Sequence, residues 1–263
     1  MDDSTSWRAI FSSWLKIEGP WVGYVVIAIA LCAAVVVGAA FGHIDGKDVV
    51  GWAFPLIGTF LGAFLAFRFQ EVKDRRSEMK GQIESVNKTL LTLASQYNHL
   101  FNYNSNVLIQ QKHPMARIGN FQATGLGDRF DARIVTEDLV FLAYRGEANL
   151  LMELSVEQGR FDSAREVVAL RCELMIKEIF PLVEKHGLLG QMITSEQLEA
   201  AFGERLFGTL VTATEQVYAH VPSTVESLLQ ASNKLHAAAK RLFPGMQFIK
   251  VAPPVAAVES VAS

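Results

Sequence analysis

Two long uncharged runs near the start of the chain constrain its architecture more than any other feature. Trp21–Phe41 and Val49–Phe67 contain no Asp, Glu, Lys or Arg. A helix of about 20 apolar residues crosses the hydrocarbon core of a bilayer, so both runs are long enough to span it. We therefore expect a transmembrane helical hairpin with spans at about 21–41 and 49–68. The alternative interpretation is a buried pair of core helices.

A cleaved signal peptide is a second alternative for the first run. Gly38-Ala39-Ala40 offers the small residues that a signal peptidase prefers. The run is, however, longer than the apolar region of about 7–15 residues in a signal peptide. The preceding segment also mixes Asp2, Asp3 and Glu18 with basic residues. These two features favour a membrane span.

The distribution of Lys and Arg predicts the orientation of the hairpin. The first twenty residues carry Arg8 and Lys16, whereas the loop between the runs carries only Lys47. A membrane-proximal basic set follows the second run: Arg68, Lys73, Arg75, Arg76 and Lys80. Basic residues gather on the cytoplasmic side of spans. We therefore expect both termini in the cytoplasm of an integral two-span protein, with the bacterial inner membrane as its location.

Small residues recur at four-residue spacing in both runs. They are Ala30, Ala34 and Gly38 in the first run, and Gly58, Gly62 and Ala66 in the second. Such stripes let helix backbones approach closely within a bilayer. They predict packing within the hairpin or along the seam of a homo-oligomer, with membrane lipid as a further partner. No ionisable residue lies inside either run, which argues against a transporter and leaves a pore built by oligomerisation open.

A heptad pattern follows the second run directly. Its positions are Phe69, Val72, Arg76, Met79, Ile83, Val86, Leu90, Leu93, Tyr97, Leu100, Asn104 and Val107. Alternating spacings of three and four residues are typical of a coiled-coil or bundle seam. The pattern predicts that the second span continues as one helix until His113-Pro114. A loop of about 20 residues then follows, which is long for a compact domain.

Further helical patterns continue after this loop. Thr136 can cap a helix that begins at Glu137 and is interrupted at Gly159. A second stripe runs from Phe161 to Val183, with a kink expected at Pro181 and the end of the helix expected at His186-Gly187. Ser195 can cap a third helix, which ends near Val221, and a last helix follows from Pro222 or Ser223 to Leu242. The sequence after Pro244-Gly245 has no periodicity and predicts a disordered tail.

The expected fold class is therefore all-α, a two-span hairpin followed by a cytosolic bundle of four or five helices. The expected division is an N-terminal cytosolic or interfacial segment at 1–20, the transmembrane hairpin at 21–68, the cytosolic helical domain at 69–243 and the disordered tail at 244–263.

The residues that could carry chemistry form no recognised constellation. The net charge of −3 indicates no nucleic-acid partner. The two cysteines, Cys32 and Cys172, form no CxxC motif, and no histidine follows a glutamate at the spacing of a di-iron site. We predict no catalytic residue, no cofactor and no metal. One stretch, residues 96–104, is unusually polar for mid-helix, and predicts contacts between helices or a polar pocket in the bundle. Its polar residues are Gln96, Asn98, His99, Asn102 and Asn104.

Three functional interpretations remain open from the sequence. The first is a membrane-anchored scaffold or signalling adaptor, whose cytosolic bundle binds a protein partner. The second is an oligomerising effector of the toxin or defence type, whose spans form a pore or perturb the bilayer. The third is a membrane-bound enzyme with an unfamiliar helical active site, built from the loop at 113–135 and the polar stretch at 96–104.

Overall fold

The computed structural model describes residues 46–111, 114–119, 123–127, 132–188 and 194–252, without the side chains of 46–54, 56–57 and 114–115. The segment 1–20 and the first predicted span, with Ala30, Ala34 and Gly38, lie outside the described residues. The chain divides into two compact units, Met1–Arg75 and Arg76–Ser263.

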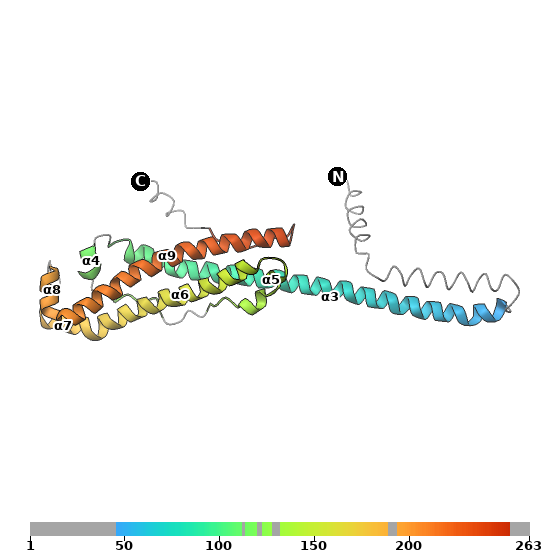
Figure 1. Cartoon of the computed structure of the whole chain (residues 1–263), viewed down its shortest axis with the longest axis horizontal. Coiled ribbons are helices and arrows are strands. Elements are labelled where there is room, and N and C mark those ends of the chain that lie inside the picture. Colours follow the sequence, from blue (N-terminus) through green and yellow to red (C-terminus); the bar gives the residue numbers. More distant parts are fainter. Residues whose placement is uncertain (1–45, 112–113, 120–122, 128–131, 189–193, 253–263) are drawn as a thin grey trace. The chain divides into compact units, whose positions relative to one another are not determined.

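All regular structure in the described residues is helical, which confirms the predicted all-α bundle (Figure 1). The long helices are α3 (Gly46–Tyr103), α6 (Ala148–Leu174) and α9 (Glu204–Leu242). The short helices are α4 (Pro114–Gly119), α5 (Phe141–Tyr144), α7 (Phe180–Lys185) and α8 (Ser195–Phe202). Two π-helical segments, η1 (Asn104–Leu108) and η3 (Met175–Ile179), and one 3-10 turn, η2 (Thr136–Leu139), complete the set.

α3 passes from the second uncharged run into the heptad pattern without a break, as the sequence predicts. It ends at Tyr103, ten residues before the predicted stop, and continues as the π-helical turn η1. Pro114 instead begins the short helix α4, where its missing N–H costs nothing. Where the structure describes placement and side chains, no helix is both long and apolar enough to cross a bilayer. The membrane-spanning interpretation stays a prediction.

The heptad seam of α3 is buried only in its C-terminal half. Val86, Leu90, Leu93, Tyr97 and Leu100 are buried, and they share one hydrophobic cluster with residues of α6 and α9. Phe69, Val72 and Met79, earlier in the same seam, are exposed. The buried half is therefore the core face of a bundle helix.

The three long helices differ in direction. Bonds between α6 and α9 join Glu157 to Ser227 and Arg171 to Thr214, so the residue number rises along one helix as it falls along the other. These two helices are antiparallel. Between α3 and α6, Gln96 pairs with Gln158 and His99 with Phe161, so the numbers rise together and the helices are parallel.

Parallel α3 and α6 require a connection that returns along the whole bundle. The described parts of this return segment (residues 123–127 and 132–135) lie along α6. The Ala123 carbonyl accepts from Cys172, the Ile134 N–H donates to Gln158, and Asp138, just beyond the segment, pairs with Lys88 of α3. The unusual length of the predicted loop follows from this topology.

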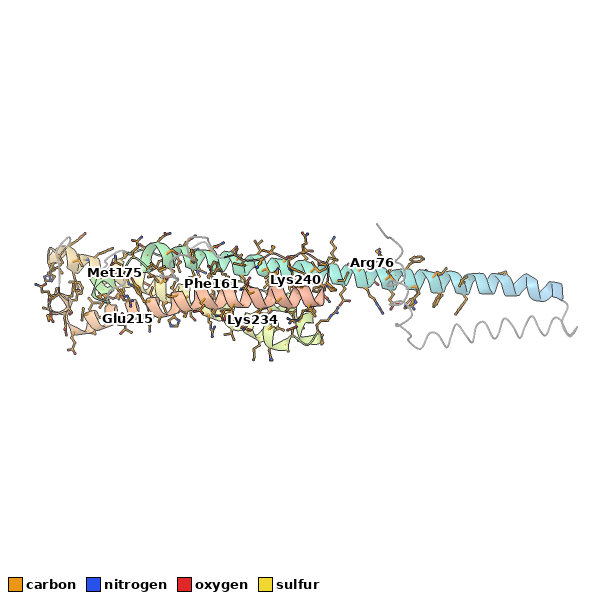
Figure 2. All side chains as sticks on the ribbon, turned by 90° about the horizontal axis from the view of Figure 1, so that it is seen from above. Arg76, Phe161, Met175, Glu215, Lys234 and Lys240 are labelled. Carbon is orange, nitrogen blue, oxygen red and sulfur yellow. The ribbon has the colours of Figure 1, made fainter. Side chains whose placement is uncertain are left out.

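The bundle interior has two hydrophobic clusters. The larger contains residues of α3, α6 and α9, among them Leu90, Phe161 and Leu228. The smaller contains residues of α6, η3, α8 and α9, among them Met175, Leu198 and Leu210. Figure 2 labels Phe161 and Met175, one from each cluster.

Two predicted helix boundaries in the middle of the chain are wrong. Thr136 is not an N-cap, because it is the first residue of the 3-10 turn η2, whose N-cap is Val135. Gly159 does not interrupt the chain, because it lies in the middle of α6. The break occurs at Gly146, whose φ of +85° suits a residue without Cβ.

Further helix boundaries differ from the predicted ones, either by one residue or because a helix is divided or continued where the sequence predicts otherwise. Thr194, not Ser195, is the N-cap of α8, and it forms a capping box with Gln197. Gly203, with φ of +80°, separates α8 from α9. α9 then continues through Pro222, where a new helix was expected. The expected stops at His186-Gly187 and Pro244-Gly245 are confirmed, because α7 ends at Lys185 and α9 at Leu242.

The residues that follow α9 pack on the bundle as far as they are described. Phe248 packs against the larger cluster, Val251 is buried, and the Ile249 N–H donates to Asn87 Oδ1 at 3.2 Å. This differs from the predicted disordered tail, because two apolar residues without helical periodicity still find a hydrophobic surface to cover. The rest of the tail, from residue 253, lies outside the described residues.

Candidate functional site

A groove of about 770 Å³ lies between α6 and the return segment. The return segment contributes Gly125, Leu126 and Gly127 to its wall, and α6 contributes Arg165 and Cys172. Gly127 has φ of +77°, which favours glycine. Gly125 lies against α6, because a Cβ built there would be 3.6 Å from Cys172 Sγ. The two glycines therefore let the backbone turn and approach the helix.

Charged residues of both signs line this groove. Arg133 pairs with Asp162 at 3.6 Å, and Lys177 pairs with Glu173 one helical turn earlier. The hydrogen bond from Lys177 lowers the pKa of Glu173, and the same bond raises the pKa of Lys177. The groove thus presents charges of both signs to solvent, beside the exposed apolar side chain of Ile176.

Two glutamines hold the return segment against the bundle. Gln96 Nε2 donates to the Ala132 carbonyl at 3.0 Å and to Gln158 Oε1 at 2.9 Å. Gln158 Oε1 also accepts from the Ile134 N–H at 2.9 Å. Gln96 is fully buried. Because buried backbone groups that lack a partner are costly, these three bonds fix where the segment lies on α3 and α6.

The five polar residues of the stretch 96–104 do not share one environment. Gln96 belongs to the pair just described, whereas Asn98 and Asn102 are exposed and Asn104, in η1, is half-buried. His99 is half-buried, with its ring 6.5 Å from that of Phe161. Burial, and then the charge of Arg165, lowers the pKa of His99. None of the five lines the groove, and the polar pocket stays a prediction.

The sequence does not predict the buried polar layer that Arg171 of α6, Thr214 of α9 and Tyr103 of α3 form. Arg171 of α6 is almost fully buried, and its Nε donates to Thr214 Oγ1 of α9 at 3.2 Å. Nearby Tyr103, at the end of α3, is also buried, and burial raises its pKa to about 12. Arg117 of α4 lies 4.4 Å from the ring centre of Tyr218. The one available signal is spacing, because Arg171 follows Ala164 and Val168 at core intervals.

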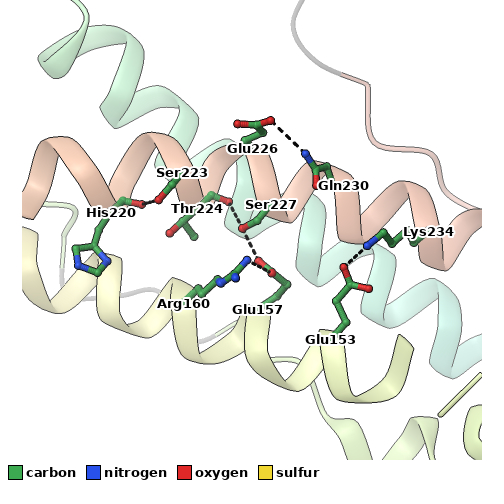
Figure 3. A network of polar contacts seen from close by, with 10 residues as sticks. All are labelled: Glu153, Glu157, Arg160, His220, Ser223, Thr224, Glu226, Ser227, Gln230 and Lys234. Carbon is green, nitrogen blue, oxygen red and sulfur yellow. Dashed lines mark hydrogen bonds and ion pairs between the residues drawn. The ribbon is translucent and has the colours of Figure 1, made fainter. Parts of the chain in front are cut away.

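A second polar network joins α6 to α9 (Figure 3). Ser227 Oγ donates to Glu157 Oε2 at 2.5 Å, and Arg160 pairs with Glu157 Oε1 at 2.8 Å. One turn away, Lys234 pairs with Glu153. Glu157 is almost fully buried, so its charge is stabilised by these partners.

The basic set of α3 divides into two groups. Arg68 and Arg75 both pair with Glu71, at 2.8 and 2.6 Å. The hydrogen bond from Arg68, together with the charges of both arginines, lowers the pKa of Glu71. Lys73, Arg76 and Lys80 are exposed. Of the small-residue stripe, Gly58, Gly62 and Ala66 are exposed, and no described atom outside the backbone of α3 itself lies within 4 Å of a Cβ built on either glycine.

Among the described residues, no group of three or more His, Cys, Asp or Glu side chains is arranged to hold a metal ion. Comparison with protein-family models, with curated proteins and with solved structures finds no match for this chain.

Proposed function

We propose that the chain is a membrane-anchored interaction protein, in which α3 links a membrane-spanning hairpin to a cytosolic bundle that binds a protein partner. The observation that carries the proposal is the exposure of the large apolar side chains in the uncharged part of α3. Phe60, Leu61, Leu65 and Phe67 are 59%, 55%, 47% and 71% exposed. Contiguous apolar surface of this kind is typical of membrane or protein contact.

The sequence adds the second line of support. Uncharged residues occupy 49–67, and the basic set begins at Arg68. That order is typical of the cytoplasmic end of a span. Both termini would then be cytoplasmic, and the location would be the inner membrane of a bacterium.

The groove beside α6 is the surface we propose for the protein partner. It is open, it carries charges of both signs, and Ile176 adds an exposed apolar side chain. A polypeptide segment with charges of both signs and one apolar anchor would complement it. Protein interfaces commonly combine such an anchor with a polar rim.

Two experiments test this function. Full-length chain in membranes should resist extraction by alkaline carbonate, and protease added to the cytoplasmic side should remove the bundle; extraction or full protection would contradict the membrane anchor.

For the partner, a photo-crosslinking amino acid at Glu166 or Ile176 should give one adduct of defined size. The same probe at Glu226, exposed on α9, should not. Adducts of equal yield at all three positions would refute the groove.

A second candidate function, an oligomeric pore, is favoured by one observation. Gly58 and Gly62 expose an open backbone surface on α3, where a second span could pack. Membrane depolarisation on expression, abolished by Gly58→Leu or Gly62→Leu but not by Ala63→Leu, would support this pore. Absence of depolarisation in the unchanged protein would refute it.

A further inference from the structure

One face of α3 combines basic and apolar side chains beyond the uncharged run. At 3.6 residues per turn, spacings of three and four residues place side chains on the same side of a helix. This basic–apolar face consists of Phe69, Val72, Lys73, Arg76, Met79 and Lys80. All six residues are exposed, and Figure 2 labels Arg76 within this stretch of α3.

The acidic residues of the same stretch lie on the other side of α3, and their carboxylates are engaged there. Glu71 pairs with Arg68 and Arg75. Asp74 accepts from Gln70 Nε2 at 2.9 Å, and Glu78 accepts from Gln82 Nε2 at 3.1 Å. Among the described residues, no ion pair neutralises the three cations of the basic–apolar face.

We propose that this face binds the headgroups of anionic phospholipids in the cytoplasmic leaflet. The inference deepens the proposed function and rests on it, because it requires the uncharged run to end at the membrane surface. Three cations, Lys73, Arg76 and Lys80, lie on the same side of α3, and in the described part of the chain no carboxylate pairs with them. Anionic leaflets attract juxtamembrane Lys and Arg.

The geometry of a helix assigns one role to Lys73 and Arg76 and another to Lys80. Lys73 follows Phe67 by six residues, or about 9 Å of helix at about 1.5 Å per residue. The headgroup layer is about 5–7 Å thick. Helical side chains point back toward the N-terminus, and long basic chains extend toward an interface. Lys73 and Arg76 therefore reach the headgroups, whereas Lys80 acts from further away, within about one Debye length of 8 Å.

The apolar half of the face favours lipid over an acidic protein. Phe69 and Val72 lie in the first turns beyond Phe67, so they continue the uncharged run into the region where aromatic and basic side chains mix. An acidic protein partner would gain nothing from Phe69 at 74% exposure unless it also carried apolar residues in register.

The test measures lipid retained by the full chain. Native mass spectrometry of the chain released from mixed micelles compares bound phosphatidylglycerol with phosphatidylcholine. The unchanged chain should prefer phosphatidylglycerol, and the preference should fall in high salt. Lys73→Gln and Arg76→Gln should each reduce the preference about fivefold, Lys80→Gln by less, and the triple variant should abolish it.

A matched control removes three cations elsewhere. Arg145, Lys185 and Arg205 are exposed and lie outside α3, so the triple variant to Gln has the same net charge. It should keep the preference. Circular dichroism at 222 nm verifies that all variants remain helical.

Each outcome decides between the proposals. A chain that carbonate extracts from membranes would refute the membrane anchor itself. A chain that resists extraction but retains both lipids equally would overturn only the lipid-binding face. A preference for phosphatidylglycerol that persists when Lys73, Arg76 and Lys80 are all replaced would also overturn the lipid-binding face. The same holds for a preference that disappears in the control variant. Binding of polyglutamate with equal retention of both lipids would reassign the face to an acidic protein and overturn the proposal.

Discussion

Ser227 of α9 donates a 2.5 Å hydrogen bond to the buried carboxylate of Glu157 on α6, a residue 70 positions earlier in the chain. Hydrogen bonds to charged groups contribute about 1.5–3 kcal/mol, more than bonds between neutral groups. Arg160 pairs with the other oxygen of the same carboxylate, so the buried carboxylate of Glu157 is stabilised by both Ser227 and Arg160.

We expect the Glu157–Ser227 bond to appear as a coupling energy. In a double-mutant cycle of Glu157→Gln and Ser227→Ala, the two single changes should not add, and the interaction should be about 1–2 kcal/mol. Urea denaturation of the full chain in detergent micelles measures the free energy of unfolding of each variant. A parallel cycle of Glu226→Gln and Gln230→Ala, an exposed pair on α9, should give a value near zero. Equal coupling in both cycles would contradict the argument.

The glutamine pair that holds the return segment should also be costly to remove. Gln96→Ala removes a fully buried side chain, opens a cavity and leaves the half-buried Ala132 carbonyl without its partner, so the free energy of unfolding should fall by about 2 kcal/mol or more. Asn98→Ala, two residues away on the exposed side of α3, should change it by less than about 0.5 kcal/mol. Hydrogen exchange at the Ile134 N–H offers a second measurement, because Gln158 accepts its bond. Unchanged exchange in Gln96→Ala would show that the segment does not depend on the pair.

The buried polar layer predicts a contrast between two threonines of α9. Thr214 accepts a hydrogen bond from the buried Arg171, whereas the exposed Thr209 donates to the Arg205 carbonyl of its own helix. Thr214→Val removes the acceptor but keeps the shape, and should cost about 1–3 kcal/mol of stability. Thr209→Val should be nearly neutral. Thermal denaturation of the two variants separates these cases, and equal melting temperatures would count against the layer.

The sequence predicts the helical class and the long helices well, because a period near 3.6 residues is a direct consequence of which face is buried. The C-terminal half of the heptad seam of α3, from Val86 to Leu100, is buried as the spacing indicates. The direction of the helices was not predictable from the same pattern. Parallel α3 and α6 depend on the return segment, whose hydrogen bonds come from residues distant in sequence.

The local errors have a common physical origin. Helix propensity alone predicts breaks at glycine and proline, whereas tertiary packing decides whether a helix continues past them. α6 passes through Gly159 and α9 through Pro222, and the neighbouring faces bury Phe161 and Val225. For the candidate site, the spacing of core positions could have identified Arg171. The sequence marks Gln96 as an unusually polar mid-helix residue, but no pattern in it identifies Ala132 as the partner of its hydrogen bond.

Gly159 lies inside α6, and among the described residues no atom outside the backbone of this helix lies within 4 Å of a Cβ built there, so glycine should be a poor residue for the position. Gly159→Ala should stabilise the protein by about 0.5–1 kcal/mol, since alanine has the higher helix propensity. Gly146→Ala is the matched contrast, because its φ of +85° is unfavourable for any residue with a Cβ. That variant should lose about 1 kcal/mol. Chemical denaturation measures both, and changes of the same sign would contradict these backbone assignments.

The lowered pKa of His99 makes the free energy of unfolding depend on pH. The pKa of His99 in the folded protein lies below the ordinary histidine value of about 6.5, because burial and the charge of Arg165 oppose protonation. As the pH falls through about 6.5, the unfolded chain therefore binds a proton before the folded one. The contribution of His99 to stability is present above this pH, and it decreases as the pH falls towards the lowered folded pKa. Below that value it no longer changes.

Replacing the imidazole isolates this effect from the carboxylates that titrate at lower pH. Between pH 7.5 and 5.5, the free energy of unfolding of the unchanged chain should decrease more steeply than that of His99→Gln. His220→Gln, a change at an exposed histidine of α9, should keep the steeper slope of the unchanged chain. An NMR titration of the imidazole gives the folded pKa independently. A value at or above 6.5, or identical slopes for the unchanged chain and His99→Gln, would show that the bundle accepts the protonated ring beside Arg165 without cost.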